Sequence, residues 1–175
     1  TGTDGSSYSY KVTSVDTAGN STASACSGSL TVTLNLAPTA LAVSSSSLAE
    51  GNLANATVGT LSTTDPDAGD TFTYSLVTGT GSTDNASFSI TGSTLKIIPV
   101  TDYEAKSSYA IRIRSTDAGG LSVEQQFTIT ITGVNEAPTL VALSSSSLAE
   151  GNLANATVGT LSTTDPDAGD TFTYS

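Results

Sequence analysis

The chain has 175 residues, and its 16 acidic and 5 basic side chains give a formal net charge of −11. This acidity argues against nucleic acid as a partner, because basic side chains bind the phosphate backbone. There is no histidine, so Ser–His and Cys–His catalysis are excluded, and we expect a protein that is not an enzyme. One cysteine allows neither an internal disulfide nor a paired-cysteine zinc site. No apolar run is long enough to span a membrane as a helix.

Residues 1–36 predict a hairpin of two alternating strands, Tyr8–Ser14 and Ser29–Asn35, around a turn at residues 18–20. Asp16 is assigned to that turn. Cys26 falls in a strand pattern and is interpreted as a buried free thiol, with a partner outside the chain as the alternative. The hairpin resembles the last hairpin of a fibronectin type III or bacterial immunoglobulin-like domain. We therefore expect residues 1–36 to be the C-terminal strands of a preceding domain.

Two short segments that end in Ala-Pro-Thr, residues 33–39 and 132–139, mark boundaries along the chain. Pro38 and Pro138 cannot donate to a strand ladder, and each restricts the backbone of the residue before it. A strand must therefore end before each proline. The sequence predicts short, stiff linkers that hold neighbouring domains end to end.

A stretch of 32 residues occurs twice, at 44–75 and again at 144–175, with a spacing of 100 residues. This spacing fits one compact module per period in a tandem array. We expect a complete module at 37–136 and the N-terminal part of the next module at 137–175. The chain is then a segment of a longer array. The final 39 residues are too few to bury a core, so we expect them to be the least stable part.

Within 37–136, apolar and polar residues alternate, which indicates half-buried strands. The first predicted strand covers Leu41–Val43 and resumes near Leu48. The others are Val58–Leu61, Thr71–Val77, Phe88–Ile90, Leu95–Ile97, Tyr109–Thr116 and Gln126–Thr132. The predicted inward side chains are Phe72, Tyr74, Leu76, Tyr109, Ile111, Ile113, Phe127, Ile129 and Ile131, with Arg112 and Arg114 facing water. Short strands at this spacing predict an all-β fold of tandem seven-stranded antiparallel Greek-key sandwiches.

The acidic residues form small groups, of which Asp65-Pro66-Asp67 and Asp102-x-Glu104 are examples. Calcium binds six to eight hard oxygen atoms in adaptable geometry, and an Asp-x-Asp step in a loop can direct two carboxylates at one ion. Without a cation, such carboxylates repel and raise each other's pKa. The alternative for residues 65–70 is a purely polar turn, and Asp70 is assigned to that turn. Asp84 and Glu124 are interpreted as solvated surface.

The stretch "DYEAKSSYAIRIRSTDAGGLS" at 102–122 resembles the second half of a cadherin repeat. An Asp-x-Glu step precedes an alternating strand that starts at Tyr109, and Asp117, Gly119 and Leu-Ser follow it. "LAEG" around Glu50 and "VNEAP" at 134–138 resemble the early Glu and the linker of that family. The linker is similar to those of cadherin-like repeats in large bacterial surface proteins. The resemblance covers 37–136 completely and 137–175 in part.

This resemblance implies that calcium ions bind at the junctions between modules. The residues implied for the central junction are Glu50, Asp102, Glu104, Asn135, Glu136, Asp165 and Asp167. Asp65, Asp67 and Asp117 are implied for the junction near residue 36. The family has an Asp where this chain has Gly133, so one or two ions are expected here, not three. Leu36 replaces the acid found at Glu136, which predicts a weaker or metal-free upstream junction.

The sequence therefore predicts a calcium-binding, extracellular or cell-surface module that stiffens an adhesive array or extends an adhesive domain. The expected partners are the neighbouring repeats and a cell-surface protein or glycan, with no nucleic acid and no membrane span. Two alternatives stay open: a spacer that needs no metal, and a carbohydrate-binding module of a secreted enzyme. The second alternative requires an exposed aromatic cluster, and the chain has no Trp.

Overall fold

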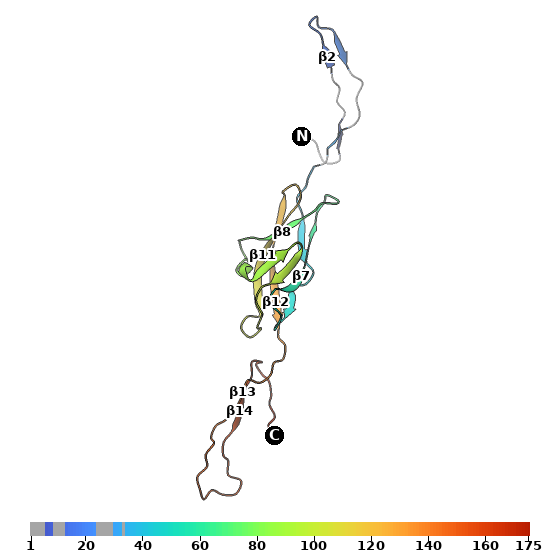
Figure 1. Cartoon of the computed structure of the whole chain (residues 1–175). Coiled ribbons are helices and arrows are strands. Elements are labelled where there is room, and N and C mark those ends of the chain that lie inside the picture. Colours follow the sequence, from blue (N-terminus) through green and yellow to red (C-terminus); the bar gives the residue numbers. More distant parts are fainter. Residues whose placement is uncertain (1–5, 9–12, 24–29, 33) are drawn as a thin grey trace.

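The computed structural model describes the chain except for residues 1–5, 9–12, 24–29 and 33. Figure 1 shows an elongated arrangement, with a β-sandwich in the middle and the strands of the two chain ends beyond its opposite poles. Among the described residues, no helix is long and apolar enough to cross a membrane. The described strands of the first 36 residues form two antiparallel pairs: β1 (Ser6–Tyr8) with β4 (Leu30–Val32), and β2 (Thr13–Val15) with β3 (Ser21–Ala23).

These pairs agree with the predicted N-terminal hairpin, although β3 was not assigned to a strand from the sequence. Its turn is built as predicted around Asp16, whose Oδ1 accepts the N–H groups of Ala18 and Asn20 at 2.9 Å each. Gly19 follows with φ of 87°, a conformation that favours glycine. The prediction for Cys26 lies outside the described residues.

The sandwich consists of two four-stranded sheets, which confirms the all-β prediction. The first sheet has the order β5 (Ala40–Val43), β7 (Ala56–Thr64), β10 (Thr94–Ile97) and β9 (Phe88–Thr91). The second has the order β6 (Ser47–Ala49), β12 (Ser122–Thr132), β11 (Ser108–Thr116) and β8 (Thr73–Leu76). A single 3-10 turn, η1 (Asn85–Ser87), precedes β9. If β5 and β6 are taken as one interrupted strand, the sandwich has the predicted seven strands.

One pair of strands departs from the antiparallel prediction: β6 runs parallel to β12, with Thr130 opposite Ser47. The chain leaves the first sheet after Val43 and enters the second at Ser47. This switch places the second half of the interrupted strand beside the last strand, which runs in the same direction. The other pairings of the sandwich are antiparallel.

The core lies between the two sheets. Its buried apolar residues are Leu41, Val58, Leu61, Phe88, Leu95, Ile97, Tyr109, Ile111, Ile113, Ile129 and Ile131. Tyr74, Leu76 and Phe127 are partly buried against this core, as the alternation predicted. The prediction for Phe72 is wrong: it is half-buried and precedes β8, outside the core cluster. Strand pairing of β8 begins at Thr73, so Phe72 belongs to the loop.

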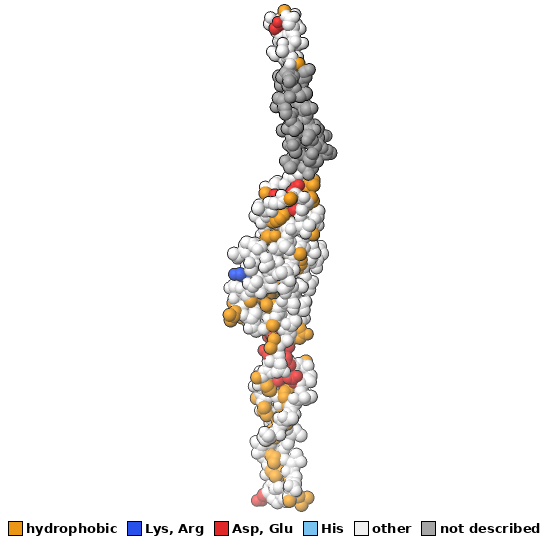
Figure 2. All heavy atoms as spheres, turned by 90° about the vertical axis from the view of Figure 1, so that its right-hand side faces the viewer, with side chains coloured by type: hydrophobic (Ala, Val, Ile, Leu, Met, Phe, Trp, Pro, Cys, Tyr) orange, Lys and Arg blue, Asp and Glu red, His pale blue; other side chains and the backbone are white. Residues whose placement is uncertain are grey.

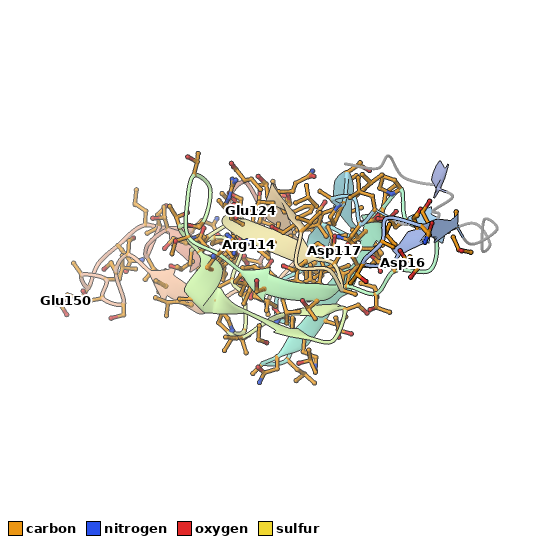
Figure 3. The ribbon with its side chains drawn as sticks, turned by 90° about the horizontal axis from the view of Figure 1, so that it is seen from above. Asp16, Arg114, Asp117, Glu124 and Glu150 are labelled. Atoms are coloured by element: carbon orange, nitrogen blue, oxygen red, sulfur yellow. The ribbon has the colours of Figure 1, made fainter. Side chains whose placement is uncertain are left out.

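Two acids expected on the solvated surface are ion-paired instead. Glu124 binds both Arg112, at 2.8 Å, and Arg114, at 2.6 Å, from the neighbouring strand β11. Figure 3 shows Arg114 and Glu124 side by side. Asp84 pairs with Lys106, and its Oδ2 accepts the N–H of Ala110. Cross-strand proximity explains the Glu124 pairs, and the approach of two loops explains the Asp84 pair. The linear pattern displays neither.

The C-terminal residues form one antiparallel pair, β13 (Leu140–Leu143) with β14 (Leu161–Thr164). Leu140 lies opposite Thr164, just as Ala40 lies opposite Thr64 in the sandwich. The second copy thus reproduces the first pairing of the sandwich in the same register.

Candidate metal centre

The acidic side chains gather at the two poles of the sandwich, where it meets the strands of the chain ends (Figure 2). The downstream junction joins the sandwich to the C-terminal strands through the linker, residues 133–139. The upstream junction lies around residues 34–36. Each pole has a group of at least three acids with ligand oxygens within 4.8 Å of one another.

Glu50 follows β6 and connects the linker to the sandwich. It is 9% exposed, and its two oxygens accept the backbone N–H groups of Tyr103 and Val134, both at 2.6 Å. The Tyr103 and Val134 hydrogen bonds hold the pKa of Glu50 below its usual value. Glu50 therefore stays charged, and its carboxylate links the start of the linker, at Val134, to the loop that contains Tyr103.

Asp102 and Glu104 share this pole with Glu50, and the three form one group. Asp102 sits at the start of a turn, where its Oδ1 accepts the N–H of Ala105 at 2.9 Å. Partial desolvation, and then repulsion from Glu50 and Asp167, raises the pKa of Glu104. The Asp-x-Glu step thus brings carboxylate oxygens within 4.8 Å of one from Glu50, a grouping that the resemblance implied.

We call residues 65–70, and their second copy at 165–170, the Asp loop. The second copy is the opposite wall of the downstream junction, with Asp165, Asp167 and Asp170 in one group. Asp165 Oδ1 accepts the N–H of Asp167 at 3.0 Å, which closes the loop. Asp167 Oδ2 accepts the N–H of Glu136 from the linker at 2.6 Å. Asp165 Oδ2 is buried and has no hydrogen-bond partner. The two walls and the linker therefore meet around a group of uncompensated carboxylates.

An open hollow of about 810 Å³ lies between these walls. Its lining includes Tyr103 and Glu104 from the sandwich, Asn135 from the linker, and Asp167 and Asp170 from the second copy. Partial desolvation, and then repulsion from Glu50 and Asp167, raises the pKa of Glu136. All seven residues implied for the central junction are thus at this pole.

The upstream junction repeats the same arrangement with the first copy of the Asp loop. Asp65 Oδ1 accepts the N–H of Asp67 at 2.8 Å, and Asp67 Oδ2 accepts the N–H of Leu36 at 2.6 Å. Asp65 Oδ2 and Asp70 Oδ2 are buried and have no hydrogen-bond partner among the residues that the structure describes. The backbone N–H of Leu36 makes the same bond as that of Glu136, so losing the acidic side chain leaves this contact intact.

Asp117 joins the upstream group from the loop after β11 and is 5% exposed. Its Oδ1 accepts the N–H of Leu121 at 2.8 Å, and its Oδ2 accepts Asn35 Nδ2 at 3.1 Å. Gly119 permits this approach, because a Cβ there would lie 2.4 Å from Asn35 Nδ2. Glu150, the second-copy equivalent of Glu50, is exposed and lies well away from Asp117 in Figure 3.

Asp70, which the sequence interpretation assigned to a turn, lies in the upstream acidic group, and its second-copy equivalent Asp170 lies in the downstream one. The N–H of Asp70 does contact Asp67 O at 3.4 Å, but its carboxylate lies in the acidic group. Desolvation, and then repulsion from Asp117, Asp65 and Asp67, raises the pKa of Asp70. The signal was present in the sequence, because three acids occur within six residues in both copies.

The donor set at both poles suits a hard divalent cation. In the described part of the chain, the ion pairs engage Asp84 and Glu124, so no basic side chain is paired with the junction acids. The ligand atoms are carboxylate oxygens, and three of them are buried without a donor. Calcium accepts six to eight such oxygens, whereas magnesium requires a strict octahedron and releases water reluctantly.

The fold is that of cadherin domains, which are immunoglobulin-like β-sandwiches. A structure titled Protocadherin Gamma B7 extracellular cadherin domains 1-4 has a TM-score of 0.54 and 18% identity over 93% of this chain and 49% of its own. Protocadherin Gamma B2 extracellular cadherin domains 1-5 has a TM-score of 0.59 and 18% identity, over 93% and 38%. Human Protocadherin-24 EC1-2 has a TM-score of 0.56 and 22% identity, over 70% and 56%.

These likenesses concern the fold alone, because the identities are low, and they do not support the predicted origin in bacterial surface proteins. The chain spans about half or less of the first two structures. No protein-family model matches the chain, and no curated protein does either.

Proposed function

We infer that the chain is a calcium-binding segment of an extracellular array of cadherin-like modules. Residues 37–136 form the complete module, 1–36 end a preceding domain, and 137–175 begin the next repeat. Calcium at the junctions holds neighbouring modules in line. The resulting stiff array serves cell adhesion or carries an adhesive domain away from a cell surface.

One observation carries this proposal: the linker and the Asp loop make the same contact at both poles. The N–H groups of Leu36 and Glu136 donate to Asp67 and Asp167 at 2.6 Å, each within a group of acids that no described basic side chain pairs with. Each group has at least one buried carboxylate oxygen without a donor. Such an arrangement repels itself unless a cation binds, so it supports a site and not a surface turn.

Different residues would hold the ion at each pole. Downstream, the ligands are Glu50, Asp102, Glu104, Asn135, Glu136, Asp165, Asp167 and Asp170. Upstream, they are Asn35, Asp65, Asp67, Asp70 and Asp117. When bound, calcium supplies the positive charge that offsets the repulsion between these carboxylates. Glu50 additionally holds the linker in place through Val134, and Asp167 does so through Glu136.

Binding to the folded form alone adds RT ln(1 + [L]/Kd) to the free energy of unfolding. At a calcium concentration of about 100 Kd, this amounts to about 2.7 kcal/mol. Extracellular calcium modules work with a Kd of about 0.1–1 mM, which fits a protein outside the cell.

Thermal unfolding of the whole chain in excess calcium and in excess chelator tests the proposal. We expect a higher midpoint in calcium, and Glu50→Gln reduces the difference. Glu150→Gln is the matched control, because it changes the same residue in the same local sequence but away from both junctions. Equal midpoints in calcium and chelator would contradict the proposal.

The same linker contacts favour a second candidate, a spacer that needs no metal. The bonds of Leu36 and Glu136 to the Asp loops are direct and require no ion. In that case chelator leaves the unfolding midpoint unchanged, while Asp167→Ala still lowers the protection of the Glu136 amide from hydrogen exchange.

A further inference from the structure

The sandwich contributes its acids to the downstream junction from two separate loops. Glu50 lies in the loop after β6, and Asp102 and Glu104 lie between β10 and β11. Residues 98–107, all of them described, contain no strand. The carboxylates of Glu50 and Glu104 repel each other while no ion is bound. Contacts between the two loops therefore decide how close together these carboxylates are held.

Three polar groups of Thr101 bond to the loop that follows Glu50. The Thr101 N–H and hydroxyl both donate to Asn52 Oδ1, the N–H at 3.0 Å, and the Thr101 carbonyl accepts the N–H of Gly51 at 2.9 Å. Thr101 is 3% exposed, so these groups depend on protein partners rather than on solvent. Gly51 has φ of 67°, a conformation that favours glycine, and it forms the turn between Glu50 and Asn52.

The amide nitrogen of Asn52 completes the connection between the loops. Nδ2 donates to Pro99 O at 3.2 Å and to Leu53 O at 2.9 Å. Asn52 thus contacts its own loop and two residues of the other. Because Oδ1 already accepts two donors and Nδ2 can only donate, Asn52 is not itself a ligand candidate.

We propose that Asn52 and Thr101 are positioning residues for the downstream calcium site, a role that rests on the proposed function. Their hydrogen bonds join the loops two residues after Glu50 and one residue before Asp102. They hold the carboxylates of Glu50, Asp102 and Glu104 together before an ion binds. Calcium then meets a preformed site, and less binding free energy is lost in ordering the loops.

A purely structural role for these hydrogen bonds would have a different signature. Their removal would then lower the stability of the sandwich and leave the calcium affinity of the folded protein unchanged. A positioning role predicts a loss of affinity that persists under conditions in which the variant is fully folded. The affinity and the stability of each variant are therefore measured separately.

The test titrates the whole chain with terbium and then with competing calcium, at a temperature where unfolding in chelator shows each variant to be folded. Tyr103 lines the hollow of the downstream junction, so terbium luminescence that is lost in Tyr103→Phe reports this pole. Asn52→Ala should weaken both ions there at least about tenfold. Asn152→Ala is the matched control: Asn152 is exposed and donates to Leu153 O at 3.2 Å, so we expect less than about a twofold effect.

Two substitutions of Thr101 keep the test decisive if Asn52→Ala does not fold. Thr101→Val keeps the shape of the buried side chain and removes the hydroxyl bond to Asn52, so we expect about threefold to tenfold weaker binding. Thr101→Ser retains the hydroxyl, so the affinity should stay within about twofold of that of the original chain.

The outcomes separate this role from the proposed function. Weaker binding in Asn52→Ala and Thr101→Val, with Thr101→Ser and Asn152→Ala unaffected, supports the positioning role. Unchanged affinity in folded Asn52→Ala or in Thr101→Val, or equal losses in Asn52→Ala and Asn152→Ala, would overturn it and leave the proposed function intact. If the original chain binds neither ion, the proposed function is overturned and the positioning role with it.

Discussion

Residues 44–75 and 144–175 have the same sequence and different structures. The first copy forms β6, a nine-residue β7 and most of β8, whereas the second forms the four-residue β14. What both copies share is local: the pairing with the preceding strand, the Asp loop, and positive φ at Asn55 and Asn155. What they do not share depends on residues 76–132. The comparison separates structure that this segment makes alone from structure that needs a partner.

The largest expected effect concerns the core residue that differs most between the copies. Leu61→Ala should lower the free energy of unfolding by about 2–5 kcal/mol, because Leu61 is 3% exposed. Leu161→Ala should change it by less than about 0.5 kcal/mol, because its side chain is 48% exposed. Urea unfolding of both variants measures the difference. Equal losses would mean that the second copy is as well covered as the first.

A smaller effect is expected from the acid that follows β6. Glu50→Ala leaves the N–H groups of Tyr103 and Val134 without their acceptor, so the unfolding midpoint should fall by several degrees even in chelator. Glu150→Ala removes an exposed side chain and should leave the midpoint unchanged. Parallel calorimetric scans of the two variants check this. A similar drop for both would show that Glu150 has a contact equivalent to that of Glu50.

The pH dependence of the unfolding midpoint compares the junctions with their acids protonated and with their acids charged. The pKa values of Glu104, Glu136 and Asp70 are raised in the fold, so the folded state binds these protons more tightly than the unfolded state. Their contribution to stability is therefore present at low pH and lost as pH rises through the folded pKa values. In chelator, we expect the midpoint to rise when the pH is lowered from about 7 to about 5.

Further acidification should reverse this gain. The pKa of Glu50 is lowered, so its contribution is present above the unfolded pKa and lost as pH falls through the folded one. In excess calcium, the gain between about pH 7 and 5 should disappear, because protons compete with the ion for the same oxygens. Calorimetric unfolding midpoints measured across this pH range, with and without calcium, test both expectations. Identical profiles in both conditions would contradict the metal proposal.

The smallest effect is expected at the upstream junction. Gly119→Ala places a Cβ 2.4 Å from Asn35 Nδ2, so the Asn35–Asp117 hydrogen bond should be lost. Faster hydrogen exchange at the Leu36 amide would report the release of this segment, with little change in overall stability. Gly92→Ala is not a fair control because Gly92 has φ of 59°; Ala118→Ser, in the same exposed loop, is a better one.

Much of the fold follows from periodicity. Alternation correctly identified β11 and β12 and their inward Ile residues, and it located the interrupted first strand. It missed the parallel β6–β12 pair, the loop position of Phe72 and the extent of β7. These features depend on which strand lies beside which. A pattern along the chain indicates which face of a strand is apolar, but not its neighbour.

The candidate site also has features that the sequence predicted and features that it missed. The predicted acids do gather at the two poles, because Asp-x-Asp and Asp-x-Glu steps direct their carboxylates through local turns. The participation of Asp70 was missed because the Asp-Pro-Asp step was interpreted as a turn, although Asp70 lies only three residues beyond Asp67 and groups with Asp65 and Asp67. The pairing of Asp84 and Glu124 with basic residues was missed because their partners lie in another loop and on a neighbouring strand.

By itself, the sequence determined the strand periods, the stops at the Ala-Pro-Thr segments, and the conformation of the Asp loop, which both copies adopt. The structure was needed to show that β6 pairs in parallel with β12, and that Asp84 and Glu124 face basic side chains. The physical reason is that turns and alternation are set by neighbours along the chain. Burial and charge proximity are set by strands that meet across long loops.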